Sequence, residues 1–237
     1  MLLPVVTETE SLAETIRILR ADCSQDLEEF ILLVCARTTE PSLALCQRLA
    51  EADPHRIRLH FQGLPFLGGA FREGFELARG THIVMMASDL ETDPRTVLRM
   101  VQEAKQHPAS VIVASRWLAK GGFEGYGAFR LALNFLFQKI FAFLYGARLT
   151  DLTFGLKVFP APLVKAILWE ELGHPFCMEA LLKPLRLGFS AREVPTSWRP
   201  RMDGVSQHPF FRNFAFAWAG LRIRFSPHTR FTKDSPT

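Results

Sequence analysis

Two carboxylates spaced two residues apart, Asp89 and Glu91, are the clearest candidates for chemistry in the sequence. They follow the apolar run of residues 83–86, which has the pattern of a strand buried on both faces of a parallel sheet. Pro94, suited to the first turn of a helix, comes next. Open α/β sheets bind ligands at the carboxyl ends of their strands, so we expect both carboxylates at a ligand site, sharing a divalent cation, Mg²⁺ or Mn²⁺. The alternative is a solvated turn.

A second candidate site suits a phosphate group. Arg130 and Asn134 are four residues apart within an expected helix and therefore share a face. Arg116 follows an expected strand, and a guanidinium fork matches the geometry of a phosphate. Ordinary surface arginines are the alternative. Asp151 can orient a bound acceptor or Arg116, or it can cap the turn that ends at Gly155.

A phosphate bound at this second site could act as a nucleophile without help. A hydroxyl group needs a general base to remove its proton, whereas a phosphate monoester is already anionic at neutral pH. Positioning and charge stabilisation are then sufficient for its reaction.

Four glycines, Gly63, Gly68, Gly69 and Gly74, punctuate the stretch that leads into an expected helix at residues 70–79. Glycine has no side chain to block close approach, so backbone amides of this loop can contact a phosphate or a ribose. A tight connection between strand and helix is the alternative, because the spacing is not that of a phosphate-binding loop.

The elements that must position these residues alternate along the first half of the chain. The expected strands cover residues 2–6, 30–34, 57–61, 83–87, 111–114 and 191–194, and residues 151–159 are expected to form a turn and a strand. The expected helices include residues 41–52, 129–145 and 178–187. This alternation predicts an α/β fold with a mostly parallel, doubly wound sheet.

Composition limits the class of protein. A hydrophobic content of 48% with 22% charged residues is ordinary for a globular chain, and a net charge of +4 gives no indication of a nucleic-acid partner. The four cysteines show no paired CxxC spacing, which suits a reducing cytoplasm. Glu8 and Glu10 interrupt the apolar start, and we expect neither a signal peptide nor a membrane span.

The C-terminal part is basic and aromatic. Residues 195–237 contain seven basic residues and two acidic ones. We therefore expect one domain at residues 1–208 and an amphipathic helical segment at residues 209–237, with a disordered tail from about Thr232. This segment and the helix at 129–145 suit an anionic membrane surface; the alternatives are core packing and the surface of a homo-oligomer.

Several short motifs occur in a characteristic order. They are Pro4-x-x-x-Glu8, Gly68-Gly69-Ala70, Asp89 with Pro94, Ser115-Arg116, Asp151-x-Thr-x-Gly155-x-Lys157-x-Phe159, Glu179, Glu193-Val-Pro195 and Arg201-x-x-Gly204-x-Ser206. In this order they resemble family 2 glycosyltransferases of the GT-A (Rossmann-like) fold. The set is similar to the dolichol-phosphate mannose synthase branch, which moves a sugar from a nucleotide onto a polyprenyl phosphate.

The resemblance implies roles for particular residues. The implied nucleotide-sugar site comprises Pro4, Glu8, Gly68, Gly69, Asp89, Arg201 and Ser206. The implied acceptor-phosphate site comprises Arg116, Arg130 and Asn134, and the implied cation ligands are Asp89 and Glu91. Catalysis then rests on Asp89, Arg116 and Asp151.

The chain departs from the family pattern at four places. Thr7 stands where the opening motif has Asn, and Ala87 stands where the metal motif has its first Asp. Glu91 stands where the branch often has a Gln that helps with the metal. Cys35 and Ala36 replace a pair of Asp residues after the second strand. These departures affect recognition of the base and binding of the metal.

The expected function is therefore an inverting glycosyltransferase, cytoplasmic and peripheral at the inner membrane face, that acts on a polyprenyl phosphate. A glycosyltransferase with a non-lipid acceptor is one alternative. Another is a catalytically silent GT-A domain that binds a nucleotide or a lipid, which the missing acidic residues favour.

Overall fold

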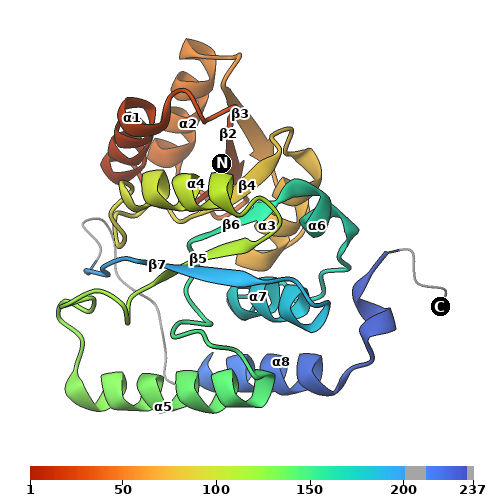
Figure 1. Cartoon of the computed structure of the whole chain (residues 1–237). Helices are drawn as coiled ribbons and strands as arrows, with labels where there is room; N and C mark the ends of the chain where they lie inside the picture. The colour runs from red at the N-terminus through yellow and green to blue at the C-terminus, as the bar shows by residue number, and fades with distance from the viewer. Residues whose placement is uncertain (201–211, 234–237) are drawn as a thin grey trace.

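The chain folds around one seven-stranded sheet of order β3-β2-β1-β4-β6-β5-β7 in a computed structural model that describes residues 1–200 and 212–233 (Figure 1). The strands are β1 (Leu2–Val5), β2 (Phe30–Val34), β3 (Ile57–Phe61), β4 (His82–Met85), β5 (Val111–Ser115), β6 (Lys157–Pro160) and β7 (Ala191–Pro195). All neighbours are parallel except β6, which runs antiparallel to both β4 and β5. The mostly parallel α/β prediction is confirmed.

Helices cover both faces of the sheet. They are α1 (Glu10–Cys23), α2 (Glu40–Ala52), α3 (Phe66–Leu77), α4 (Thr96–Gln106), α5 (Ala128–Tyr145), α6 (Ala161–Ala166), α7 (Phe176–Arg186) and α8 (Arg212–Phe225). Buried side chains of α1, α2 and α4 form a core on one face, and those of α3, α6 and α7 form a core on the other. The sheet is therefore doubly wound, as predicted.

The position of β2 explains its sequence. Its five residues are all apolar and all buried, because β1 and β3 flank it and helices cover both of its faces. A central parallel strand has no solvated face and so needs no alternation of polar residues. Strand β5 is also fully buried, although it is parallel only to β7 and antiparallel to β6.

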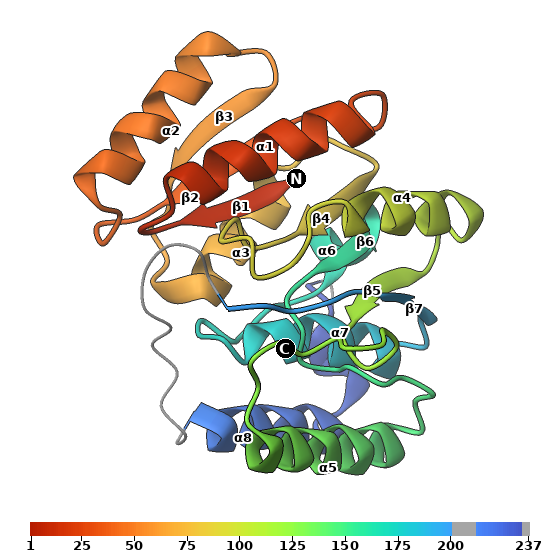
Figure 2. The same cartoon turned by 90° about the vertical axis from the view of Figure 1, so that its left-hand side faces the viewer.

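Helices α5 and α8 lie side by side as a separate layer beyond α7, in both views (Figures 1 and 2). Tyr145 of α5 donates a hydrogen bond to the Gly220 carbonyl oxygen at 2.6 Å, and Arg224 donates one to the Leu144 carbonyl oxygen at 2.8 Å. The predicted amphipathic C-terminal helix thus exists and packs on the domain. By length and composition alone, α5 is also a candidate membrane span, contrary to the expectation of none.

Two expectations about element ends need correction. Helix α3 begins at Phe66, not at residue 70, so Gly68 and Gly69 lie within the helix and not in a loop. Thr232 and Lys233 do not begin a disordered tail, because Thr232 pairs with Ile167 and the Lys233 amide donates to the Ala166 carbonyl oxygen. The domain division after residue 208 stays a prediction.

Candidate active site

The Asp89 turn lies at the carboxyl end of β4, where the sequence predicts it. Asp89 is 3% exposed, and its Oδ1 accepts a hydrogen bond from the Glu91 amide at 3.1 Å. Leu90, between the two carboxylates, has a left-handed backbone with φ of 57°. That conformation costs roughly 1–2 kcal/mol in an L-residue. Backbone strain of this kind clusters at functional sites.

Trp198 connects this turn to the glycine-rich loop before α5, and sequence reasoning missed it. The indole Nε1 donates to Glu91 Oε2 at 2.9 Å. The Trp198 amide donates to the Gly122 carbonyl oxygen, and the Trp198 carbonyl oxygen accepts from the Glu124 amide. The Asp89 turn and the loop that contains Gly122 and Glu124 are therefore held together.

Arg116 and Asp151 form a buried, bidentate ion pair. Arg116 Nε lies 2.7 Å from Asp151 Oδ2, and Arg116 Nη2 lies 2.9 Å from Asp151 Oδ1. Burial opposes the charge on Arg116, but the Asp151 carboxylate more than compensates and raises the pKa of the guanidinium. Phe123 and Phe154 place their rings 5.1 and 4.5 Å from the guanidinium carbon. Asp151 makes its shortest contacts with Arg116, and its Oδ1 also accepts a longer hydrogen bond of 3.5 Å from the Thr153 hydroxyl within its own turn.

Glu193 fixes the backbone that carries Asp151. Its carboxylate accepts hydrogen bonds from the amides of Thr150 and Asp151 at 2.8 and 2.9 Å. The Thr150 hydroxyl also contacts the Ser115 hydroxyl at 2.6 Å. Strands β5 and β7 thus hold the turn from two sides, which explains why Ser115 and Glu193 accompany Arg116 and Asp151 in the motif set.

The two acceptor candidates on α5 differ in their surroundings. Asn134 accepts a hydrogen bond from the Gln138 amide group at 3.1 Å, and Gln138 in turn donates to the Thr153 hydroxyl at 2.9 Å. Asn134 is therefore linked to the turn that carries Asp151. Arg130 is exposed, and its guanidinium carbon lies 5.1 Å from the centre of the Tyr126 ring.

Pro4 on β1 and Glu8 just after it, the residues expected to bind the nucleotide sugar, lie near the Asp89 turn. The Ser88 hydroxyl donates to the Pro4 carbonyl oxygen at 3.5 Å, and Glu8 is buried with Oε2 accepting from the amides of Val6 and Thr7. The loop after β2 carries no carboxylate at Cys35 and Ala36. The Thr38 hydroxyl stabilises this loop by accepting from the Cys35 amide.

Gly68 and Gly69 do not present free amides to a ligand. Both amides donate to the Leu172 carbonyl oxygen, at 2.6 and 3.3 Å. A Cβ on Gly68 would lie 2.5 Å from the Glu171 carbonyl oxygen, so the close approach of the segment before α7 to α3 explains this glycine. These two amides are thus already engaged within the chain, which fits the alternative of a tight connection, and a role for Gly68 and Gly69 in nucleotide binding stays a prediction. Arg201 and Ser206 lie outside the described residues.

The carboxylate oxygens of the Asp89 turn fit a cation that takes most of its ligands from a bound substrate. Within the described residues, no group of three or more His, Cys, Asp or Glu side chains is arranged to hold a metal. Mg²⁺ is commonly held by one or two carboxylates together with water and phosphate oxygens. Asp89 and Glu91 supply two such carboxylates, although they do not form a complete set of protein ligands.

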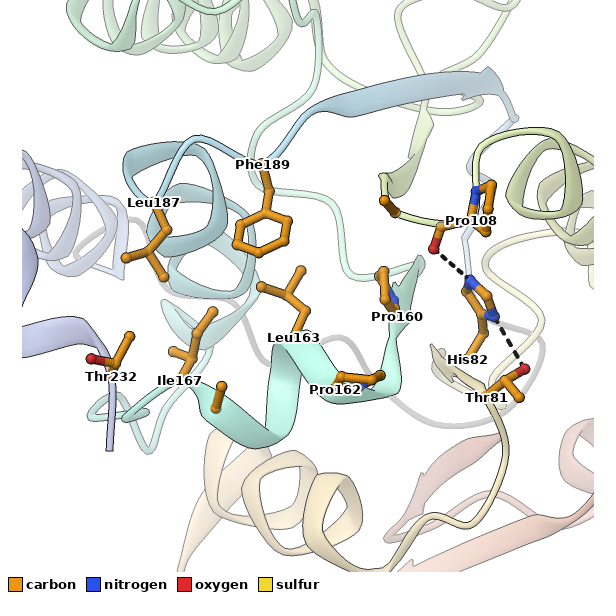
Figure 3. Close-up of a pocket in the computed structure, with 12 residues that line it drawn as sticks. Thr81, His82, Pro108, Pro160, Pro162, Leu163, Ile167, Leu187, Phe189 and Thr232 are labelled. Carbon is orange, nitrogen blue, oxygen red and sulfur yellow. Dashed lines mark hydrogen bonds between the residues drawn. The ribbon is translucent and has the colours of Figure 1, made fainter. Parts of the chain in front are cut away.

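The apolar cavity in Figure 3 is a different feature. It has a volume of about 600 Å³ and lies at the amino ends of β4 and β5, between His82 and Phe189 (Figure 3). His82 Nε2 contacts the Pro108 carbonyl oxygen there at 3.0 Å. Of the described residues predicted to form the site, none lines it. The candidate active site is at the opposite, carboxyl edge of the sheet.

Comparisons with known proteins agree with this geometry. The model of the family described as glycosyl transferase family 2 matches residues 1–168, and the chain belongs to that family. Among solved structures, the fold is similar to glucosyl-3-phosphoglycerate synthase from Mycobacterium tuberculosis in complex with Mn²⁺, UDP and phosphoglyceric acid. The TM-score is 0.66 at 17% identity, over 95% of this chain and 78% of that one. The fold is GT-A, and the protein is a family 2 glycosyltransferase, as the motifs predicted.

Two relatives are similar in sequence over most of their length. A polyprenol monophosphomannose synthase from Mycolicibacterium smegmatis is 27% identical over 87% of this chain and 79% of the relative. An undecaprenyl-phosphate mannosyltransferase from Micrococcus luteus is 26% identical over 94% of this chain and 97% of the relative. The resemblance to polyprenyl-phosphate sugar synthases is confirmed.

Proposed function

We propose that the protein transfers a sugar from a nucleotide-sugar donor to a polyprenyl phosphate at a membrane surface, with inversion at the anomeric carbon. The observation that carries the proposal is the Arg116–Asp151 pair, held at the ligand edge of the sheet beside an exposed apolar helix. The names of the two relatives support the same donor and acceptor classes.

Arg116 is suited to hold the acceptor phosphate. Asp151 engages Nε and Nη2, whereas Nη1 donates to no residue in the part of the chain that the structure describes. A bidentate carboxylate therefore locks the guanidinium in one orientation and leaves Nη1 as the donor for a phosphate oxygen. A phosphate oxygen bound there attacks the anomeric carbon while the bond to the nucleoside diphosphate breaks. The phosphate is already ionised, so no side chain has to remove a proton.

Asp89 and Glu91 would hold a divalent cation on the diphosphate of the donor. The cation would stabilise negative charge on the leaving group as a Lewis acid. Two solved neighbours contain Mn²⁺ or Mg²⁺ together with UDP, which supports a cation in this fold. Pro4 and Glu8 lie on the neighbouring strand and its following loop, and we assign them to the donor side.

Helices α5 and α8 each expose an apolar stripe with the same spacing. The exposed side chains are Phe129, Leu133, Leu136, Ile140 and Phe143 on α5, and Phe214, Trp218, Leu221 and Phe225 on α8. Intervals of four and three residues keep such a stripe on one side of a helix. Exposed apolar stripes on two adjacent helices suit a membrane interface, where aromatic rings lie at headgroup depth. We place this layer on the inner membrane face.

Two basic residues of α8, Arg222 and Arg224, serve the fold more than the surface. Arg222 pairs with Glu170 and Glu171, and Arg224 donates to the Leu144 carbonyl oxygen. The membrane contact is therefore assigned to the apolar stripes, with Arg130 and Lys139 of α5 as exposed cations.

The test is transfer of radiolabelled sugar from UDP-, GDP- and CDP-sugars to short polyprenyl phosphates, with Mg²⁺ or Mn²⁺. Arg116→Lys should lower transfer and leave nucleotide binding intact, because an ammonium cannot reproduce the bidentate fork. Arg58→Lys is the matched control, since Arg58 pairs with Glu29 near the amino edge of the sheet. Transfer unaffected by Arg116→Lys and Arg130→Ala would place the acceptor elsewhere.

The missing acidic residues at Cys35, Ala36 and Ala87 favour a second candidate, a silent nucleotide- or lipid-binding module. Nucleotide binding without transfer, across the whole panel of donors and with both lipid and soluble acceptors, would support that candidate. Transfer to a soluble acceptor alone would support a glycosyltransferase with a non-lipid acceptor.

A further inference from the structure

Gln138 is the polar exception on the inner side of α5. The helix has eighteen residues, and the buried ones are Gln138, Phe141 and Ala142. Phe141 and Ala142 are apolar and pack in the core beside α7 and α8. Burying an amide has a free-energy cost unless its hydrogen bonds are satisfied, so the partners of Gln138 indicate its purpose.

Those partners belong to the turn of the candidate active site. Gln138 Oε1 accepts from the Leu152 amide at 2.8 Å, which fixes the orientation of the side-chain amide. Gln138 Nε2 then donates to the Thr153 hydroxyl at 2.9 Å and lies 3.5 Å from Asp151 Oδ1. One side chain thus holds the backbone immediately after Asp151, the carboxylate that orients Arg116.

The outer side of the same helix is the apolar stripe from Phe129 to Phe143. Gln138 lies two residues from both Leu136 and Ile140, which at 3.6 residues per turn puts it on the opposite side of the helix. Helix α5 therefore presents the apolar stripe on its outer side and Gln138 on its inner side. A movement of α5 would change the distance between Gln138 and the turn that carries Asp151.

We infer that Gln138 is a positioning residue that transmits the seating of α5 on a membrane to the Arg116–Asp151 pair. The inference rests on the proposed membrane contact of α5. When the stripe is bound, the helix is held, the Gln138–Leu152 hydrogen bond is maintained, and Asp151 keeps Arg116 in its phosphate-binding orientation. Off the membrane, the turn opens more often, and the nucleotide site is unaffected.

The experiment follows hydrogen exchange of the Leu152 amide in the full chain, with and without vesicles of phosphatidylglycerol and phosphatidylcholine. In the wild type, vesicles should slow exchange at Leu152 as well as along α5. In Gln138→Leu the Leu152 amide has lost its acceptor, so it should exchange faster and no longer respond to vesicles, although the variant still binds them. Gln102→Leu, the same change at an exposed position of α4, should behave as the wild type.

A second variant separates the hydrogen bond from packing. Gln138→Glu keeps an oxygen for the Leu152 amide but loses the donor to Thr153 and adds a carboxylate near Asp151. Its transfer rate should fall by one to two orders of magnitude, on the order expected for misplaced reacting groups, with KM for the donor unchanged. The rate should recover partly as pH falls and the new carboxyl group is protonated.

Three results would overturn the inference. The first is a Leu152 amide that ignores vesicles while α5 itself becomes protected. The second is a Gln138→Leu protein whose Leu152 amide responds as in the wild type. The third is a chain that binds no vesicles, which would also remove the membrane part of the proposed function; sugar transfer to a soluble short-chain polyprenyl phosphate tests the rest of that function separately.

Discussion

The indole of Trp198 donates a 2.9 Å hydrogen bond to the Glu91 carboxylate across 107 residues of sequence. Glu91 is one of the two carboxylates that we assign to the cation, so Trp198 orients a proposed cation ligand through a hydrogen bond. Partners of this kind usually affect metal affinity strongly, although they do not touch the metal.

Trp198→Phe should therefore weaken the cation site without removing it. The ring still packs on Tyr126, but the hydrogen bond to Glu91 is lost. We expect the Mn²⁺ concentration for half-maximal stabilisation by nucleoside diphosphate to rise about tenfold. Thermal shift with titrated Mn²⁺ measures this, and Trp218→Phe on the surface of α8 is the control. If nucleoside diphosphate stabilises the protein equally in EDTA, no cation takes part in nucleotide binding.

The base of the nucleotide should be read weakly. The loop after β2 offers no carboxylate at Cys35 or Ala36 to accept a hydrogen bond from a base. We expect the Kd values of UDP, GDP and CDP to agree within about tenfold, or ~1.4 kcal/mol. Calorimetric titration in the presence of Mn²⁺ checks this. A clear preference for one base would mean that other residues read it.

Asp151→Asn should destabilise the fold as well as stop transfer. Arg116 is buried, and an amide leaves its charge without a counterion. Breaking one partner of a buried pair costs about 3–5 kcal/mol of unfolding free energy. Asp53→Asn is the control, because its pair with Arg20 is more exposed and should contribute about 1 kcal/mol or less. Urea denaturation of the two variants decides; similar losses in both would contradict the prediction.

Lys157 makes stability depend on pH. Burial lowers the pKa of its ammonium to about 8, although Cys177 and Asp151 oppose the shift. Above pH 8 the folded state releases this proton while the unfolded chain keeps it up to about pH 10.5, so the free energy of unfolding rises with pH in that window. Below pH 8 both states carry the proton, and the full cost of burying the charge is present.

Lys157→Met removes this titration. Relative to the variant, the wild type should gain up to about 3 kcal/mol of unfolding free energy between pH 7.5 and pH 10. Comparing the two proteins cancels the opposite contributions of Cys23, Cys46 and Tyr145, on which Lys157 does not act. Cys177 is coupled to Lys157, so both proteins should carry Cys177→Ala. Urea denaturation at four pH values provides the measurement, and parallel curves for the two proteins would refute it.

Phe143→Glu should weaken binding to anionic vesicles and leave the fold intact. Phe143 is 89% exposed at the end of the α5 stripe, so the change costs little packing. A carboxylate at a membrane interface is repelled by anionic lipid, and vesicle partitioning should fall about tenfold. Phe61→Glu, at an exposed site on the edge strand β3, is the matched control. Equal partitioning of both variants would argue against a membrane role for the stripe.

Much of the fold follows from local pattern. The continuous apolar runs of β2 and β5 predict buried strands because no polar alternation is needed there. The start of α3 does not follow, since the helix is entered through Phe66, whose φ of 61° is unusual for a large side chain. A residue type that disfavours its own backbone conformation gives no local signal of it.

The residues of the candidate site also fall into those that the sequence predicts and those that it does not. Asp89, Arg116 and Asp151 stand at strand ends and turns, where residue type alone suggests a role. Trp198 and Gln138 act through partners 107 and 14 residues away, and such pairings are set by tertiary packing. For Gln138 one signal was present, because it is a polar residue opposite an apolar stripe and four residues from Asn134.

The place of β6 in the sheet has a consequence for the order in which the chain assembles. Strands β1 to β4 can pair with one another once residue 85 has been made, but β5 pairs only with β6 and β7, both later in the chain. Until residues 157–160 are synthesised, β5 and one edge of β4 stay unpaired, and unpaired apolar strands aggregate. Chains truncated between residues 116 and 156 contain β5 without β6, and they should therefore be insoluble. A chain that extends past residue 195 contains every strand of the sheet.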